Sequence, residues 1–169
     1  MATIYFSGTE CHTFGELPRV GSAAPEFRLV TPALEEVTKE TYAGKRVVLN
    51  IFPSLDTAVC ATSVRRFNKE AAALDNTVVL AVSVDLPFAA GRFCTAEGIT
   101  NVTPASAFRE PEFAKNYGVL IVDGPLKGLL ARAVVIIDEK GNIAYADMNH
   151  EVTEEPHYDE ALNVLKGKF

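Results

Sequence analysis

The sequence predicts an α/β fold with one mixed central sheet and helices on both of its faces. Two observations favour this class. As far as residue 96, apolar segments typical of buried strands alternate with segments whose apolar residues have helical spacing, a pattern typical of parallel strands joined by crossover helices. Residues 131–138 and 142–148 are then typical of two strands joined by a tight turn at Glu139-Lys140-Gly141, which adds antiparallel strands to the sheet.

The N-terminal part predicts a β-hairpin that precedes the main sheet. Two β-prone segments, residues 3–6 and 11–14, flank the turn-forming tetrapeptide Ser7-Gly8-Thr9-Glu10. After the hairpin we expect a loop at 17–25, a strand at 27–30, a weakly paired strand at 33–37 and a helical turn at 41–44 that Gly44 ends.

The central part of the chain is a strand followed by a cysteine-bearing helix. Residues 47–52 are an apolar run typical of a buried strand, and Pro53 ends it because proline lacks the N–H that a strand ladder needs. Residues 60–74 have apolar side chains at helical spacing, and Asp56 or Thr57 is a candidate helix cap.

Cys60 therefore falls in or near the first turn of a helix. Unpaired backbone N–H groups and the positive end of the helix dipole favour a thiolate there, and a thiolate is a better nucleophile than a thiol. A small buried apolar residue at a helix start explains the same position. Position alone favours neither interpretation.

The remaining elements are predicted from the spacing of apolar residues and from Pro and Gly residues at their ends. The segment 124–128 is rich in Gly but lacks the Gly-Lys-Ser/Thr ending of a phosphate-binding loop, so we expect an ordered loop. The pattern also predicts a buried strand at 77–85, a helix from Pro87 that Gly98 ends, a short strand at 102–108, a short helix at 111–117 that stops at Gly118, and a C-terminal helix at 158–166.

Composition excludes several classes of function. A chain of 169 residues that is 48% hydrophobic suits a single domain, residues 1–169, with a sizeable core. Sixteen basic against 22 acidic residues give a net charge of −6 with no basic block, so neither nucleic acid nor an anionic membrane is expected as a partner. No apolar run has the length of a membrane-spanning helix, and residues 1–8 lack the features of a signal peptide. We therefore expect a cytoplasmic protein with reduced thiols.

The cysteine and histidine usage predicts no metal site and no cofactor. The three cysteines include no Cys-x-x-Cys pair, which excludes the usual dithiol oxidoreductase signature and a four-cysteine zinc site. Cys11 and His12 are adjacent on a predicted strand, where their side chains point to opposite faces. We expect structural or solvated roles for the three histidines, His12, His150 and His157, the last two being isolated in an acidic segment.

Pro53, Thr57 and Cys60 fit the pattern Pro-x-x-x-Thr-x-x-Cys in full. This is the active-site motif of peroxiredoxins, and the chain resembles their atypical two-cysteine branch, the bacterial thiol peroxidases, from its first strand to its last helix. Further segments carry the resemblance: Asn50–Ser54, Ser63–Arg65, Asp85–Ala89, Arg92–Cys94, Asp123–Gly128 and Ala131–Val135. The resemblance implies a thioredoxin-like fold with an N-terminal hairpin, a homodimer, and thioredoxin as the electron donor.

The resemblance also implies a catalytic set of Pro53, Thr57, Cys60 and Arg132. Cys60 would attack peroxide and become a sulfenic acid. Arg132 stands in an otherwise apolar predicted strand, where an arginine is costly unless it has a partner or a task, although a surface position near a strand start is the alternative. The Thr57 hydroxyl lies one helical turn before Cys60 and could reach sulfur and peroxide or simply cap the helix, and Pro53 would shield the pocket.

Cys94 is the resolving cysteine that the resemblance implies. It follows Cys60 by 34 residues (94 − 60) on the next predicted helix, where a structural role as a buried cysteine is the alternative. Two helices rarely hold cysteines at bonding distance, so formation of an intramolecular disulfide is expected to need local unwinding. Cys11 matches no function of the family.

Four apolar residues are candidates for a pocket rim that favours alkyl hydroperoxides over hydrogen peroxide, although a core would use the same residues: Phe52, Leu55, Phe88 and Phe93. The sequence is compatible with three functions. The first is a thioredoxin-dependent peroxidase that reduces hydrogen peroxide and organic hydroperoxides. The second is a thiol-based peroxide sensor that passes oxidation to a partner protein. The third is a thioredoxin-like binding domain whose cysteines only pack.

Overall fold

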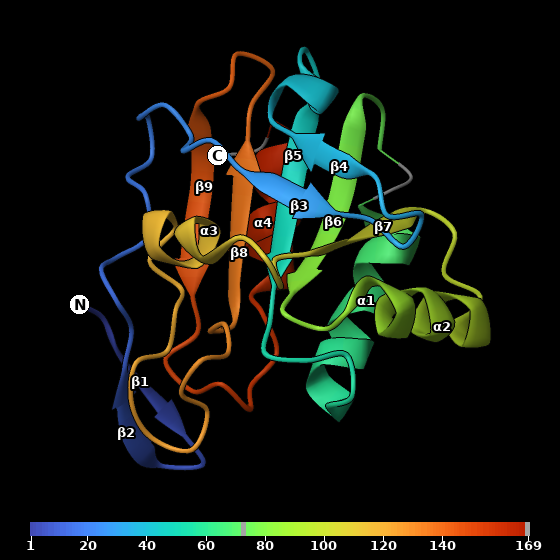
Figure 1. Ribbon diagram of the computed structural model, residues 1–169. Helices are drawn as coiled ribbons and strands as arrows, with labels where there is room; N and C mark the ends of the chain where they lie inside the picture. Colours follow the sequence, from blue (N-terminus) through green and yellow to red (C-terminus); the bar gives the residue numbers. More distant parts are fainter. Residues whose placement is uncertain (72–73, 168–169) are drawn as a thin grey trace.

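The computed structural model describes residues 1–71 and 74–167. In this part of the chain, a seven-stranded mixed sheet forms the centre of the molecule, in the order β4-β3-β7-β6-β5-β8-β9 (Figure 1). Its three middle strands, β7, β6 and β5, are parallel, and the outer ones join antiparallel. The strands are β3 (Arg28–Val30), β4 (Glu36–Thr38), β5 (Arg46–Ile51), β6 (Thr77–Ser83), β7 (Val102–Ser106), β8 (Ala133–Ile137) and β9 (Ile143–Met148).

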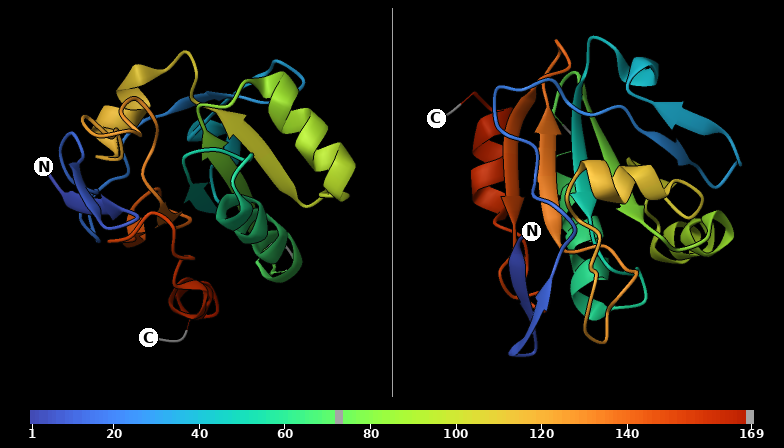
Figure 2. Two further views of the ribbon diagram at one scale, coloured as in Figure 1. Left: turned by 90° about the horizontal axis from the view of Figure 1, so that it is seen from below. Right: turned by 60° about the vertical axis from the view of Figure 1, so that its left-hand side comes forward.

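Helices lie on both faces of the sheet, as the alternating pattern predicts (Figure 2). Side chains of α1 and α4 share a core with alternate strand residues such as Val48, while α3 and the N-terminal hairpin share a second core with residues such as Leu49. Neighbouring residues of β5 thus point to opposite faces. The helices are α1 (Ala58–Glu70), α2 (Pro87–Glu97), α3 (Pro111–Asn116) and α4 (Tyr158–Leu165), with a 3₁₀ turn η1 at Glu40–Tyr42.

The N-terminal hairpin is confirmed, but its second strand begins two residues earlier than predicted. The strands are β1 (Thr3–Phe6) and β2 (Thr9–His12), and they pair with Phe6 opposite Thr9. The turn is therefore only Ser7-Gly8, and both of these residues have positive φ, 49° and 84°. A two-residue turn of this kind matches the twist of the strands, so Thr9 and Glu10 belong to the ladder.

Several further boundaries differ from the sequence prediction: β4 is shifted from 33–37 to Glu36–Thr38, β6 ends at Ser83, and β7, β8 and α1 are shorter than predicted at one end. β7 stops at Ser106, because the Ser106 hydroxyl bonds the Asp85 carbonyl and the chain turns at the next residues. β8 begins at Ala133, since the Ala131 N–H bonds Val119 outside the sheet. α1 ends at Glu70, short of the predicted residue 74, and residues 72 and 73 of that prediction lie outside the described residues. Within the described ranges, no helix has the length and apolarity needed to cross a membrane.

Candidate active site

Cys60 is the third residue of α1 and its side chain is fully buried. The chain reaches it from β5 through the buried Pro53 and an extended Thr57, which is the N-cap residue with φ −107° and ψ 144°. The placement of Cys60 in the first helical turn is therefore confirmed. The predicted side-chain cap is wrong, because the Thr57 hydroxyl donates instead to the carbonyl of Ser54, at 3.0 Å. That hydroxyl points toward the loop that contains Ser54, and its oxygen accepts no hydrogen bond from the N–H groups of the helix.

Arg132 reaches the Cys60 sulfur from a point 72 residues away in the chain. Its Nη2 donates to Cys60 Sγ at 3.1 Å, and its Nε donates to the Val152 carbonyl at 2.7 Å. Arg132 is 2% exposed, so its guanidinium meets the sulfur in a poorly solvated environment, where the contact is little screened by water. Arg132 directly precedes β8 and does not lie inside it as predicted.

One nitrogen of the same guanidinium is unused. Among the described residues, buried Arg132 Nη1 has no hydrogen-bond partner. A buried donor without a partner costs free energy, and such atoms in native proteins call for an explanation. Because Nη2 already contacts the sulfur, Nη1 is available to an oxygen atom of a molecule that approaches Cys60.

An apolar pocket of about 300 Å³ lies beside these groups. Pro53, Thr57 and Arg132 line it together with Ser54. The rest of its lining is largely apolar and comes from the hairpin, the start of α1, and the loops before β8 and α4: Phe6, Ala58, Val59, Leu126, Leu129, Val152 and Thr153. The structure therefore brings Pro53, Thr57 and Arg132 together around one pocket, next to the first turn of α1, which contains Cys60.

The predicted rim of this pocket is wrong. Phe52 is fully buried and Phe88 is 70% exposed at the start of α2, and neither lines the pocket. Leu55 and Phe93 line a different cavity of about 310 Å³ beside α2. The actual walls include Phe6 of the hairpin and Leu126 of the segment 124–128, which are remote from Cys60 in the sequence. The apolar residues within and after that Gly-rich loop were the available signal.

Cys94 lies on α2, and an ion pair connects α2 to α1. Arg65 of α1 forms a two-pronged ion pair with Glu97 of α2, at 2.9 and 3.0 Å. Cys94 is half-buried, and this burial raises the pKa of its thiol, which keeps it protonated at neutral pH. Cys60 and Cys94 are both free thiols here, on helices held together by a contact away from either sulfur.

The other candidate residues lie apart from this pocket. Cys11 is a buried free thiol in the hairpin, and burial and nearby carboxylates raise its pKa. His12 is paired with Asp123, with 2.7 Å between His12 Nδ1 and Asp123 Oδ2. We interpret Cys11 and His12 as structural residues, and neither lines the pocket beside Arg132.

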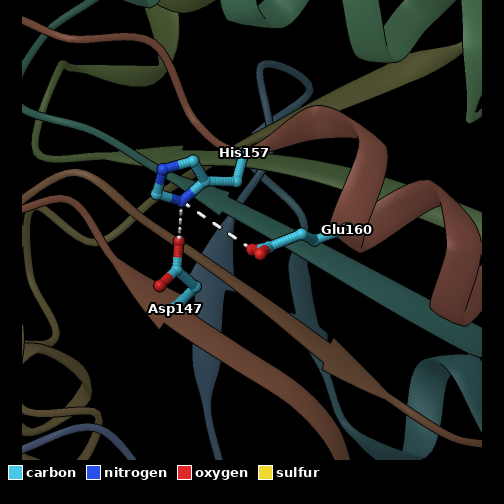
Figure 3. Close-up of side chains that lie close together, drawn as sticks. All are labelled: Asp147, His157 and Glu160. Carbon is cyan, nitrogen blue, oxygen red and sulfur yellow. Dashed lines mark hydrogen bonds and ion pairs between the residues drawn. The ribbon is translucent and has the colours of Figure 1, made fainter. Parts of the chain in front are cut away.

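His157, Asp147 and Glu160 lie together where β9 meets the start of α4, so His157 has partners that its surroundings in the sequence did not indicate (Figure 3). His157 Nδ1 lies 2.7 Å from Asp147 Oδ2 and 3.8 Å from Glu160 Oε2. The hydrogen bond to Asp147 raises the pKa of His157. These atoms lie within 4.8 Å of one another, close enough for a metal ion, but His157 and Glu160 are exposed and the three side chains already pair with one another. We interpret the cluster as a surface ion-pair group.

Comparison with known proteins identifies relatives of the chain. The model of the Redoxin family matches residues 19–162. Thiol peroxidases of Corynebacterium glutamicum and Mycobacterium bovis are 55% and 54% identical to this chain over 165 residues, covering 98% of it and 99% of each relative. A crystal structure of a peroxiredoxin-like protein from Aquifex aeolicus superimposes with a TM-score of 0.93 at 44% identity, covering 99% of this chain and 97% of the other.

These matches extend over nearly the whole chain, and the structural match confirms the thioredoxin-like fold with a mixed sheet flanked by helices and an N-terminal hairpin. The chain therefore belongs to the Redoxin family and, within it, to the bacterial thiol peroxidases.

Proposed function

We propose that this protein is a thioredoxin-dependent thiol peroxidase, an oxidoreductase of the peroxiredoxin type, which reduces hydrogen peroxide and organic hydroperoxides to water and alcohols. The observation that carries the proposal is the contact of 3.1 Å between Arg132 Nη2 and Cys60 Sγ beside an apolar pocket. A cation that touches a buried sulfur at a helix N-terminus favours the thiolate that peroxide chemistry requires.

In the first step, the Cys60 thiolate attacks one peroxide oxygen. The S–O bond forms as the O–O bond breaks, Cys60 becomes a sulfenic acid, and the departing alkoxide takes up a proton to leave as an alcohol, or as water from hydrogen peroxide. The unpaired Nη1 of Arg132 suits the charge that develops on the peroxide oxygens. The Thr57 hydroxyl can orient the peroxide, and Pro53 shields the pocket from bulk water.

In the second step, the Cys94 thiol condenses with the Cys60 sulfenic acid. An S–S bond forms and water leaves, which gives an intramolecular disulfide. The half-buried setting of Cys94 and the Arg65–Glu97 ion pair support the view that α2 or the start of α1 has to open locally first. Thioredoxin then reduces the disulfide by thiol–disulfide exchange and returns both thiols.

The apolar lining of the pocket supports organic hydroperoxides as the preferred substrates. Phe6, Leu126 and Leu129 would cover an alkyl group while the peroxide end lies toward Arg132. Because hydrogen peroxide has no apolar part, it gains nothing from these walls.

The likeness to thiol peroxidases and the cysteine usage extend the proposal to the whole protein. We propose that residues 1–169 act as a single domain, that the protein is a homodimer, and that it works in the cytoplasm, where thioredoxin keeps thiols reduced. Light scattering of the purified protein tests the dimer.

NADPH consumption with thioredoxin, thioredoxin reductase and cumene hydroperoxide tests the proposed activity. Continued turnover supports the peroxidase. Oxidation of one protein equivalent without turnover contradicts it and favours the sensor that passes its disulfide to a partner protein. Comparison of cumene hydroperoxide with hydrogen peroxide at equal concentrations tests the substrate preference.

A further inference from the structure

We propose that Asp85 is a positioning residue that holds the Cys60 loop in the conformation competent for peroxide attack, and that its contacts have to be released before the disulfide can form. This inference rests on the proposed function of Cys60 and Cys94. It concerns a residue outside the catalytic set of Pro53, Thr57, Cys60 and Arg132.

The Asp85 carboxylate joins two segments that are about 30 residues apart in the chain. Its Oδ1 accepts a hydrogen bond of 2.8 Å from the Ser54 hydroxyl, and its Oδ2 accepts one of 2.8 Å from the Leu55 backbone N–H. Oδ2 also accepts from the Ser83 hydroxyl at 2.7 Å. Both carboxylate oxygens are thus used by the loop or by the end of β6.

These contacts reach Cys60 through a short series of hydrogen bonds. The Ser54 carbonyl accepts from both the backbone N–H and the hydroxyl of Thr57, at 3.3 and 3.0 Å. Thr57 is the N-cap of α1, and Cys60 lies three residues further on in the first turn. Asp85 therefore fixes Ser54, Ser54 fixes Thr57, and Thr57 sets where the first helical turn begins.

The same residue stands immediately before the helix that carries Cys94. Leu86 is the N-cap of α2 and Pro87 is its first residue. The hydrogen bonds of the Asp85 carboxylate therefore connect the start of the helix that carries Cys94 to the loop before the helix that carries Cys60. Asp85, Leu55 and Phe93 line the cavity of about 310 Å³ between the loop and α2. This cavity is space into which either segment can move when the hydrogen bonds open.

The Asp85 contacts are suited to reversible opening. Within the described ranges, no lysine or arginine forms an ion pair with this carboxylate, which is held by neutral donors alone. Water can replace neutral donors at a small net cost because Asp85 is only partly buried. The contacts are therefore strong enough to define the loop and weak enough to exchange during each catalytic cycle.

Two variants of Asp85 distinguish the effect of its hydrogen bonds from the effect of its negative charge. Asp85→Ala removes all three side-chain contacts. Asp85→Asn keeps one acceptor oxygen for the Leu55 N–H and the Ser83 hydroxyl, while its amide can donate to the Ser54 oxygen. Asp138→Ala is the matched control, since the Asp138 carboxylate also accepts hydrogen bonds from neutral donors, the backbone N–H groups of Lys140 and Asn142 at 2.9 Å, but at the far β8–β9 turn.

Rapid-quench mass spectrometry measures the two steps separately, as the second-order rate of Cys60 oxidation and the first-order rate of disulfide formation. We expect Asp85→Ala to slow Cys60 oxidation about 10- to 100-fold through misplacement of the reacting sulfur. Disulfide formation should stay equal or become faster, so less sulfinic acid accumulates at high peroxide. Asp85→Asn and Asp138→Ala should both remain close to the unaltered protein.

An equal loss in both steps, or no loss in Cys60 oxidation, would overturn the positioning role. So would an Asp85→Asn variant as slow as Asp85→Ala, because charge would then matter in place of geometry. If Asp85→Ala does not fold, Ser54→Ala removes one contact and should slow Cys60 oxidation to a smaller degree, and no slowing would count against the inference. Peroxide that leaves the Cys60 thiol of the unaltered protein unreacted would overturn the proposed function itself.

Discussion

Replacement of Arg132 by methionine is the most informative perturbation of the proposed mechanism. Methionine keeps much of the side-chain length but removes the cation and both hydrogen bonds, to Cys60 Sγ and to the Val152 carbonyl. The change leaves the thiolate without the charged donor at 3.1 Å and leaves the peroxide without the unpaired Nη1.

The contacts allow an estimate of the effect on rate. A hydrogen bond that involves a charged group contributes about 1.5–3 kcal/mol. Since about 1.4 kcal/mol corresponds to a factor of ten in rate, loss of the Arg132 contact in the transition state should slow peroxide attack about 10- to 150-fold. The variant also leaves the buried Val152 carbonyl without its donor, so we expect it to be less stable by about 1–3 kcal/mol, a loss that the fold should survive.

Stopped-flow measurement of Cys60 oxidation tests this prediction, and we expect the reaction of Arg132→Met to be slower by that factor. Arg28→Met is a suitable control, since Arg28 forms a surface ion pair with Glu36 at the β3–β4 edge of the sheet. Equal rates of Cys60 oxidation in Arg132→Met and the unaltered protein would refute the reasoning and make Arg132 a structural residue.

Three further predictions concern the cysteines and the surface cluster. Cys60→Ser should abolish turnover, since Cys60 is the thiol that Arg132 contacts, and NADPH consumption at near the original rate would contradict its role. Cys94→Ser should reduce about one equivalent of peroxide and then stall with thioredoxin, and a Cys11-linked or intermolecular peptide in the oxidised unaltered protein would count against Cys94. Asp147 raises the pKa of His157 above its ordinary 6.5, so the pair stabilises the fold fully below that pH and loses this stabilisation as pH rises through the raised value. Asp147→Asn should therefore lower thermal stability at pH values below 6.5 and leave it unchanged at alkaline pH; for so exposed a pair the difference is about 0.5 kcal/mol.

Much of the secondary structure could be predicted because its causes are local. The apolar spacing of residues 47–52 specifies β5, and Pro53 ends the strand for a steric and hydrogen-bonding reason that depends on no other part of the chain. Pro87 at the first position of α2 and Gly98 with a φ of 68° at its end are likewise local signals. The hairpin turn was misplaced because its two-residue form depends on the pairing of the strands.

The surroundings of the reactive sulfur could be predicted only in part. The motif and the resemblance named Pro53, Thr57, Cys60 and Arg132, but not the helix cap or the pocket walls. Thr57 is the N-cap residue of α1, but its side chain makes no capping hydrogen bond. Its hydroxyl donates instead to the Ser54 carbonyl, which a tight loop places nearby. Phe6 and Leu126 line the pocket because the hairpin and the loop before β8 fold over the start of α1, which local spacing cannot indicate.

The sequence by itself determined that a cysteine would begin a helix directly after a buried strand, since strand periodicity, proline and helical spacing act over a few neighbouring residues. Only the tertiary structure decided what surrounds that cysteine. The crossovers of the sheet bring Arg132 to 3.1 Å from Cys60 across 72 residues, and Asp85 to the loop across about 30 residues. Such contacts depend on how whole elements pack, because a side chain finds a remote partner only after the core has set the positions of both backbones.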